Sequence, residues 1–201
     1  GGNPTLLLET GATDRSATYT GGSGTNTLTF DYTVVAGDTT GDLDVHDSAD
    51  QITIPASSSI QDGSGNDASN DAPTGVESGA LAASYAVVVD GVAPTVSSVT
   101  STDGTYKIGD TVSVSVVYDD TVTVVTTGGN PTLLLETGGT DRTATYTGGS
   151  GTNTLTFGYT VVAGDTTGDL DVHDSADQIT VPASSSIRDG AGNDASNDVP
   201  T

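Results

Sequence analysis

Residues 111–118 read TVSVSVVY, and residues 154–161 read TLTFGYTV. In both stretches every second side chain is apolar, and the side chains between them are mostly Ser, Thr or Gly. A hydrophobic period of two predicts β-strands with one buried and one wet face. The expected buried set is Val112, Val114, Val116, Tyr118, Leu155, Phe157, Tyr159 and Val161.

Similar but shorter segments occur throughout the chain. We expect strands at 95–100, 122–126, 131–137, 142–147, 178–181 and 81–89, with turns at Asp103-Gly104 and at Gly148–Gly151 between them. No segment has a helical period for more than one turn. Seven or more short strands at this spacing predict an all-β Greek-key sandwich of immunoglobulin (Ig) type, with a closed barrel as the alternative.

A long internal repeat sets the domain organisation. Residues 1–74 align without gaps on residues 128–201, an offset of 127 residues, and only seven of the 74 positions differ. Such copies predict a tandem array with a 127-residue period. We therefore expect two Ig-like repeats: residues 1–91, which lack the opening strands, and residues 92–201, which lack the closing strand.

The charge of the chain narrows the possible partners. Its 201 residues include 27 Asp and Glu against four Lys and Arg, for a formal net charge of −23. This charge disfavours nucleic acid and anionic membrane surfaces, and suits a self-repelling extracellular surface or one that takes up cations. No apolar run approaches the roughly 18 residues of a membrane-spanning helix, and there is no Cys for a disulfide or for thiol chemistry.

Several ordered landmarks resemble the tandem Ig-like or cadherin-like repeats of giant bacterial surface proteins and adhesins. They are Asp90-Gly-Val-Ala-Pro-Thr-Val96, Asp103-Gly-Thr-Tyr-Lys-Ile-Gly-Asp110, the Gly-rich hairpin within 145–159, Val162-Ala-Gly-Asp165 and Ile187-Arg-Asp-Gly-Ala-Gly-Asn-Asp194. The resemblance covers essentially the whole chain. It implies an extracellular, cell-surface stalk or adhesive array that Ca²⁺ makes rigid.

The same resemblance suggests calcium ligands. Asp90 would be the linker carboxylate, Asp120 the acidic residue after the second strand, and Asp119 an additional carboxylate beside it. The loop ligands would be Asp189, Asn193 and Asp194, matched in the first copy by Asp62, Asn66 and Asp67. In Ig topology we expect Asp90 to approach the other carboxylates at the junction. The alternative is a Gly-rich turn whose Asp and Asn bind backbone groups.

A second acidic run offers a weaker candidate site. It contains Asp38, Asp42 and Asp44 in the first copy and Asp165, Asp169 and Asp171 in the second. Its alternation with Leu170 and Val172 also fits a strand with an acidic, solvated face. His173 and its counterpart His46 are expected to be surface residues, because a transition-metal site requires a cluster of His or Cys.

We expect a structural role rather than an enzymatic one. Stacked repeats of the same chain, or identical chains, would form a calcium-stiffened rod or fibre. One alternative is an adhesive module that contacts a carbohydrate, a cell surface or ice, although the chain has only two Phe and no Trp to form a sugar platform. Another is a filament subunit completed by strands from neighbouring chains. A catalytic triad is not expected from Asp171, His173 and Ser175, although they lie close in sequence. A triad is a spatial arrangement and also needs an oxyanion hole.

Overall fold

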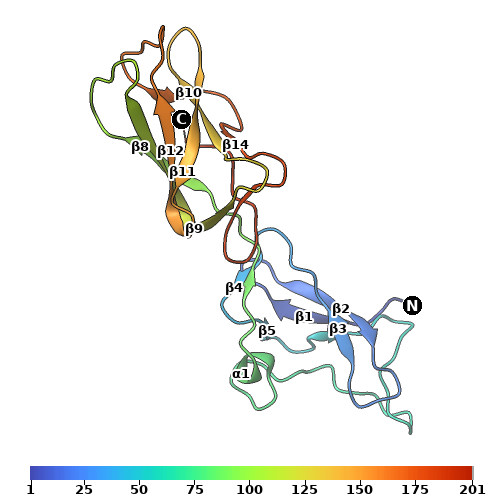
Figure 1. The fold of residues 1–201 in the computed structure, drawn as a ribbon. Coiled ribbons are helices and arrows are strands. Elements are labelled where there is room, and N and C mark those ends of the chain that lie inside the picture. Colours follow the sequence, from blue (N-terminus) through green and yellow to red (C-terminus); the bar gives the residue numbers. More distant parts are fainter. Residues whose placement is uncertain (201) are drawn as a thin grey trace. The chain divides into compact units, whose positions relative to one another are not determined.

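A computed structural model describes residues 1–200, and its internal contacts divide the chain into two units, Gly1–Val92 and Ala93–Thr201 (Figure 1). Nearly all regular structure is antiparallel β-sheet, as the alternating pattern predicts. Within residues 1–200 the one helix, α1 (Leu81–Ser84), is a single turn. Among the described residues, no helix is both long and apolar enough to cross a membrane.

Eight strands form the sheet of the second unit: β8 (Val96–Ser101), β9 (Thr111–Val125), β10 (Thr132–Glu136), β11 (Arg142–Gly148), β12 (Thr152–Thr160), β13 (Asp171–Val172), β14 (Ile179–Thr180) and β15 (Ser186–Arg188). The strand order is β13-β10-β11-β12-β9-β15. In addition, β14 pairs with β10, and β8 pairs with β9. The expected strands at 95–100, 131–137, 142–147 and 178–181 are therefore all present.

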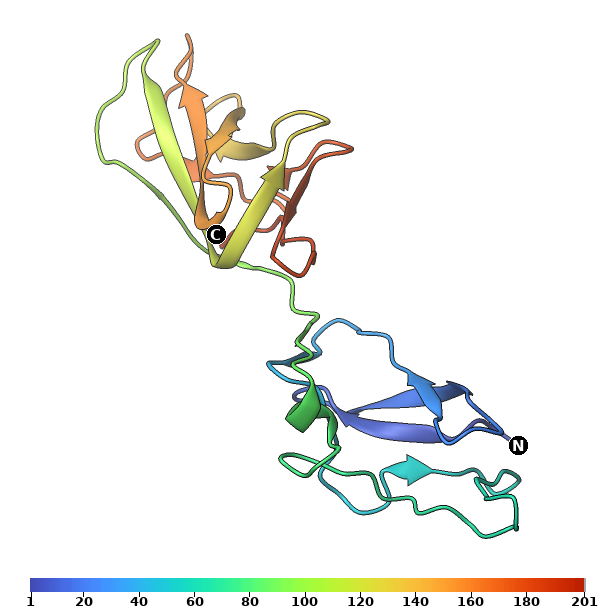
Figure 2. The same ribbon diagram turned by 60° about the horizontal axis from the view of Figure 1, so that its bottom comes forward.

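Strand β9 differs from its prediction. The sequence suggested strands at 111–118 and 122–126 separated by an acidic loop, but the structure has one strand that includes Asp119 and Asp120. Its first part pairs with β8 and β12, and residues 123–125 pair with β15. Figure 2 shows the two parts running in different directions from a sharp corner. The acidic pair thus lies where the strand changes partners.

The core of the second unit contains the apolar faces that the alternation identified. Phe157 and Leu155 of β12 are fully buried and lie opposite Val114 and Val116 of β9. The phenol ring of Tyr146 contacts the ring of Phe157 edge-on, with 5.9 Å between the centroids. Burial of these apolar side chains, together with the contact between the two rings, stabilises the unit.

Seven short strands make up the first unit: β1 (Thr5–Glu9), β2 (Arg15–Gly21), β3 (Thr29–Asp31), β4 (Thr39–Thr40), β5 (Asp44–Val45), β6 (Ile52–Thr53) and β7 (Val89–Asp90). The order of the main sheet is β3-β2-β1-β5, β6 pairs with β1, and β4 pairs with β7. Registers recur between the units at the same offset as the sequence repeat. Thr5 lies opposite Thr18 in the first unit, for example, and Thr132 lies opposite Thr145 in the second.

The segment that closes the first unit also departs from its prediction. A strand was expected over 81–89, but residues 81–84 form α1 and only residues 89 and 90 pair as a strand. Leu81-Ala-Ala-Ser84 has few β-branched residues, and Ala and Leu favour a helix over a strand. The segment therefore crosses the unit as a helical turn followed by a short strand.

Candidate cation-binding sites

The loop at Asp189 is folded around its own carboxylate. Asp189 Oδ1 accepts hydrogen bonds from the backbone N–H groups of Ala191, Gly192 and Asn193 at 2.9, 2.7 and 2.9 Å. Asp189 Oδ2 accepts one from the side-chain amide of Asn193 at 2.7 Å. Burial of Asp189 acts to raise the pKa of its carboxyl, but these hydrogen bonds outweigh that effect and lower it. The carboxylate is thus held in its charged form.

The first copy repeats this loop geometry on the surface. Asp62 Oδ1 accepts hydrogen bonds from the N–H groups of Ser64 and Asn66, and its Oδ2 accepts one from the Asn66 amide. The Asn66 amide is the main cause of the lowered pKa of the Asp62 carboxyl. In both copies, therefore, the aspartate of the loop binds backbone N–H groups and the asparagine amide binds that aspartate, an arrangement that also fits the turn alternative. These hydrogen bonds fall mainly on Oδ1 of each aspartate and leave Oδ2 with an acceptor position for an ion.

The last acidic residue of each loop has a different partner. Asp194 forms an ion pair with Arg188, with 2.6 Å between Oδ1 and Nε. In the first copy Gln61 replaces the arginine and donates a hydrogen bond to Asp67 at 2.9 Å. A cation at Asp194 would have to compete with the guanidinium group.

The two aspartates at the corner of β9 differ in how they are engaged. Asp119 accepts hydrogen bonds from both the backbone N–H and the hydroxyl of Thr95, at 2.8 and 2.6 Å, and the hydroxyl is the main cause of its lowered pKa. Asp120 accepts one bond, from the N–H of Thr121. Carboxylate oxygens of Asp120 and Asp189 lie within 4.8 Å of each other. These two residues are therefore the predicted ligands that the second unit brings together.

The linker residue Asp90 belongs to the first unit. It lies in β7, opposite Thr39 of β4, and its carboxylate accepts a hydrogen bond from the N–H of Val92 at 3.1 Å. A junction that combines Asp90 with the carboxylates of the second unit stays a prediction.

The second acidic run contains one buried aspartate in each copy. Asp165 Oδ1 lies 3.0 Å from Arg142 Nε, and its Oδ2 accepts hydrogen bonds from the hydroxyl of Tyr159 at 2.5 Å and the N–H of Val162 at 3.0 Å. The tyrosine hydroxyl is the main cause of the lowered pKa of the Asp165 carboxyl. Burial, with the carboxylate beside it, raises the pKa of Tyr159 to about 12.

The equivalent contacts in the first unit join Asp38 to Arg15 and Tyr32. In each copy the buried aspartate therefore has an arginine, a tyrosine and a backbone N–H as partners. These contacts give the residue a role in the fold.

The other members of the run differ between the units. In the first, Asp42 accepts a hydrogen bond from the N–H of Val87, and Asp44 accepts bonds from the N–H groups of Gly75 and Ala82. In the second, among the described residues, the Asp171 carboxylate accepts only the bond from the N–H of the next residue, Val172, which Asp44 likewise accepts from Val45. Asp42 and Asp44 thus bind the closing segment of the first unit.

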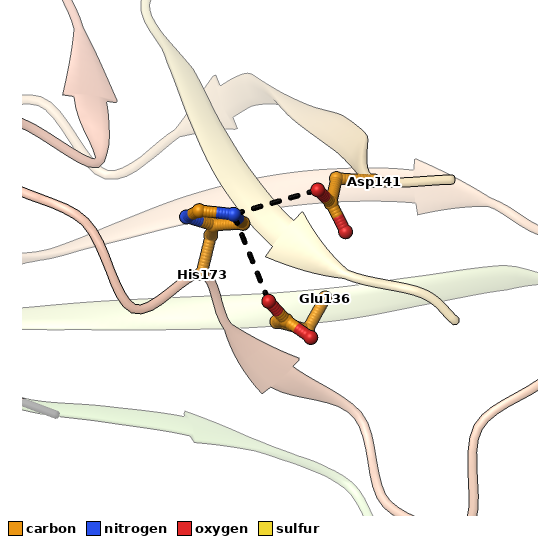
Figure 3. Close-up of side chains that lie close together, drawn as sticks. All are labelled: Glu136, Asp141 and His173. Carbon is orange, nitrogen blue, oxygen red and sulfur yellow. Dashed lines mark ion pairs between the residues drawn. The ribbon is translucent and has the colours of Figure 1, made fainter. Parts of the chain in front are cut away.

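Sequence analysis missed a cluster around each histidine. His173 Nε2 lies 3.4 Å from Asp141 Oδ2 and 3.7 Å from Glu136 Oε1 (Figure 3). His46 has the same two neighbours in the first copy, Asp14 at 3.2 Å and Glu9 at 4.0 Å. A protonated imidazole would pair with two carboxylates, and a neutral one could share a divalent ion with them.

The sequence gives little sign of this cluster, because its members come from three separate segments. Glu136 ends β10 and lies opposite Asp171 of β13, two residues before His173. Asp141 precedes β11. The pairing of β10 with β13 brings Glu136 to the imidazole, and the turn between β10 and β11 places Asp141 beside it. The Nδ1 atom of His173 is buried without a hydrogen-bond partner among the described residues.

Comparisons of the chain with protein-family models, with curated proteins and with solved structures find no match.

Proposed function

We propose that this chain is a structural module of an extracellular rod or fibre, built of tandem Ig-like Greek-key sandwiches that Ca²⁺ stabilises. The observation that carries the proposal is the duplication of internal contacts. Arg15 pairs with Asp38 at 2.9 Å in one unit, and Arg142 pairs with Asp165 at 3.0 Å in the other. Two units that share a nearly identical stretch of 74 residues, with the same buried polar contacts in each, suit a repeated building block.

The strand order of the second unit supports Greek-key topology. Strands β10, β11 and β12 follow one another in sequence and lie side by side, while β9, which precedes them, lies beside β12. In a Greek key, three strands that are consecutive in sequence are neighbours in the sheet, and a fourth strand lies beside the one of them that is farthest from it in sequence. The corner in β9 adds a means of joining two layers, because residues 111–117 of this strand pair with β12 and residues 123–125 pair with β15.

Calcium is proposed at Asp120 and Asp189. Their carboxylate oxygens lie within 4.8 Å, and Asp189 is only 5% exposed. Neither carboxylate has an ion pair with Lys, Arg or His among the described residues. Two nearby carboxylates repel each other, and a hard divalent cation that prefers oxygen ligands would remove that repulsion.

The size of the effect can be estimated from ordinary extracellular calcium sites. Such sites bind with Kd of about 10⁻⁴–10⁻³ M. At roughly 10 mM calcium, one site would stabilise the folded unit by about 1.4–2.7 kcal/mol. This is a large share of the stability of a small domain.

Calorimetric unfolding of the full chain during a calcium titration tests the proposal. We expect one transition to move to higher temperature as the calcium concentration rises through about 0.1–1 mM and beyond, and no such shift with magnesium or after EGTA. Asp120→Asn should remove most of the shift, since it deletes one charged ligand and keeps an oxygen that can accept the Thr121 N–H. Asp169→Asn, at an exposed acidic position of the same unit, is the matched control and should keep the shift. A calcium-insensitive melting curve would refute the calcium part of the proposal.

A further inference from the structure

Residues 75–91, the closing segment of the first unit, lie along residues 37–44. Strand β7 pairs antiparallel with β4, so that Asp90 faces Thr39 and Val89 faces Thr40. Backbone hydrogen bonds extend this pairing in both directions. The Gly37 N–H donates to the Gly91 carbonyl at 2.8 Å, the Gly91 N–H donates to the Asp38 carbonyl at 2.7 Å, and the Leu43 N–H donates to the Val87 carbonyl at 2.7 Å.

Side chains also hold the closing segment. Val89 is 5% exposed and belongs to the core of the first unit, and Leu81 packs against the same core. The residue preceding Val89, Val88, is 70% exposed. The segment therefore has one apolar anchor in its strand, next to an outward-facing residue of the same type.

The second unit has the same edge in sequence. Residues 159–180 are identical to residues 32–53, so positions 164–171 repeat positions 37–44. The backbone N–H groups of Gly164 and Leu170 correspond to those that bind the closing segment in the first unit. Within the described residues of the second unit they have no hydrogen-bond partner.

Equivalent side chains on this edge are more exposed in the second unit. Leu43 is buried whereas Leu170 is half-buried. Thr40 and Asp44 are half-buried whereas their counterparts Thr167 and Asp171 are exposed. Because the residues are identical, the difference in burial follows from the segment that covers one edge and not the other.

A groove follows this edge in the second unit. Its volume is about 720 Å³, and its walls are residues 101–106 on one side and residues 165–170 on the other. A smaller hollow of about 130 Å³ continues it, and Ser101 and Leu170 line both. Leu170 and Val161 supply apolar contacts in the groove and also pack against the core.

We propose that this groove is the docking site for a segment with the sequence of residues 75–91, supplied in line by a further copy of the repeat. The segment would add a short strand to the edge at 164–167, and its valine equivalent to Val89 would complete the core. This inference rests on the tandem-repeat part of the proposed function. It does not depend on calcium.

The chemistry of the groove favours a peptide over a sugar. Its two tyrosine hydroxyls are already engaged, since Tyr159 donates to Asp165 and Tyr106 donates to the Thr102 carbonyl at 2.9 Å. Tyr159 is also buried, so its ring offers no open stacking platform. What the edge presents instead, within the described residues, is the open N–H groups of Gly164 and Leu170, which a peptide backbone can bind.

A cross-linking experiment tests the docking site, because the chain has no cysteine of its own. The full chain is extended at its end by a second copy of residues 75–91 and carries Thr166→Cys together with Asp90→Cys in the appended copy only. These positions correspond to the partners Thr39 and Asp90 of the first unit, and opposite residues of paired strands are close enough for a disulfide. Thr39→Cys with Asp90→Cys in the unextended chain gives the reference rate. All reactions contain EGTA.

We expect an intramolecular disulfide that forms at a rate within about threefold of the reference and does not depend on protein concentration. Val89→Asp in the appended copy should slow it at least tenfold, while Val88→Asp in that copy should leave it unchanged. Both substitutions lie outside the 201 residues, so neither can unfold the second unit directly. Equal rates for the two variants would show random collision of a tail and overturn the proposal. Disulfides found only between chains would overturn the proposal that the segment comes from the same chain. A melting temperature that does not respond to calcium would leave the cross-linking result unaffected.

Discussion

Phe157 and Phe30 occupy equivalent positions in the two units, and their truncation should have unequal costs. Each ring contacts a tyrosine edge-on with 5.9 Å between centroids. Phe157 is fully buried, because β9 covers the outer edge of β12. Phe30 lies in β3, the edge strand of its sheet, and is half-buried.

Phe157→Ala should therefore leave an enclosed cavity and destabilise the second unit by about 3–5 kcal/mol. At the half-buried position water reaches the vacated space, so Phe30→Ala should cost only the lost transfer free energy, about 1–2 kcal/mol. A unit of this size loses about 4–8 °C in Tm for each kcal/mol, and the two changes should separate clearly.

Calorimetry of the full chain measures both variants, with each substitution shifting the transition of its own unit. Urea denaturation followed by tyrosine fluorescence provides the free energies. Equal losses in unfolding free energy for Phe157→Ala and Phe30→Ala would refute this reasoning, which attributes the larger loss at Phe157 to its burial by β9.

Two further predictions concern the second unit. Gly149→Ala should destabilise the second unit by more than about 1 kcal/mol, because Gly149 has a φ of +104° and a Cβ there would lie 2.1 Å from a backbone carbonyl oxygen. Gly148→Ala is the control, since a Cβ at Gly148 has open space around it. Similar Tm values for the two variants would contradict the prediction. Tyr159→Phe should make the unit more sensitive to acid. The lowered pKa of Asp165 contributes stability above the unfolded pKa of about 3.9, and that stability is lost as the pH falls through the folded pKa. Without the tyrosine hydroxyl, the pKa of Asp165 in the folded unit moves back toward its ordinary value. The variant should therefore be less stable than the parent near neutral pH and should begin to unfold at a higher pH. The difference in unfolding free energy between the two proteins should become smaller in strong acid. Parallel pH-stability curves measured by urea denaturation would refute this reasoning.

The sequence predicted the all-β class and most strands, because alternation of apolar and polar side chains is a local signal. It could not predict that β9 continues through Asp119 and Asp120, since two adjacent aspartates normally indicate a loop and only pairing with β15 reveals a strand. Nor could it predict α1, where local helix propensity and a turn geometry outweigh the short apolar run that follows.

Predicting the sites was harder because contacts between distant residues decide them. Asp165 looked like part of a solvated acidic face, yet Arg142, 23 residues earlier, neutralises it within the fold. The cluster at His173 likewise depends on the register of β10 with β13. Asp189 was identified from its loop pattern, but its hydrogen bonds to three backbone N–H groups could be known only from the structure.

The matching registers of the two units have a consequence for refolding. Strand β10 pairs with β11 through residues nearly identical to those with which β1 pairs with β2, so β10 could also pair with β2 at almost no loss in contact energy. A denatured chain can thus close the correct hairpins or exchange them between units, and such misassembly is characteristic of repeat proteins. Because each correct hairpin spans only a short loop, it closes faster than an exchanged pair separated by more than a hundred residues. Faster formation of the local hairpins would therefore prevent the two repeats from exchanging strands during refolding.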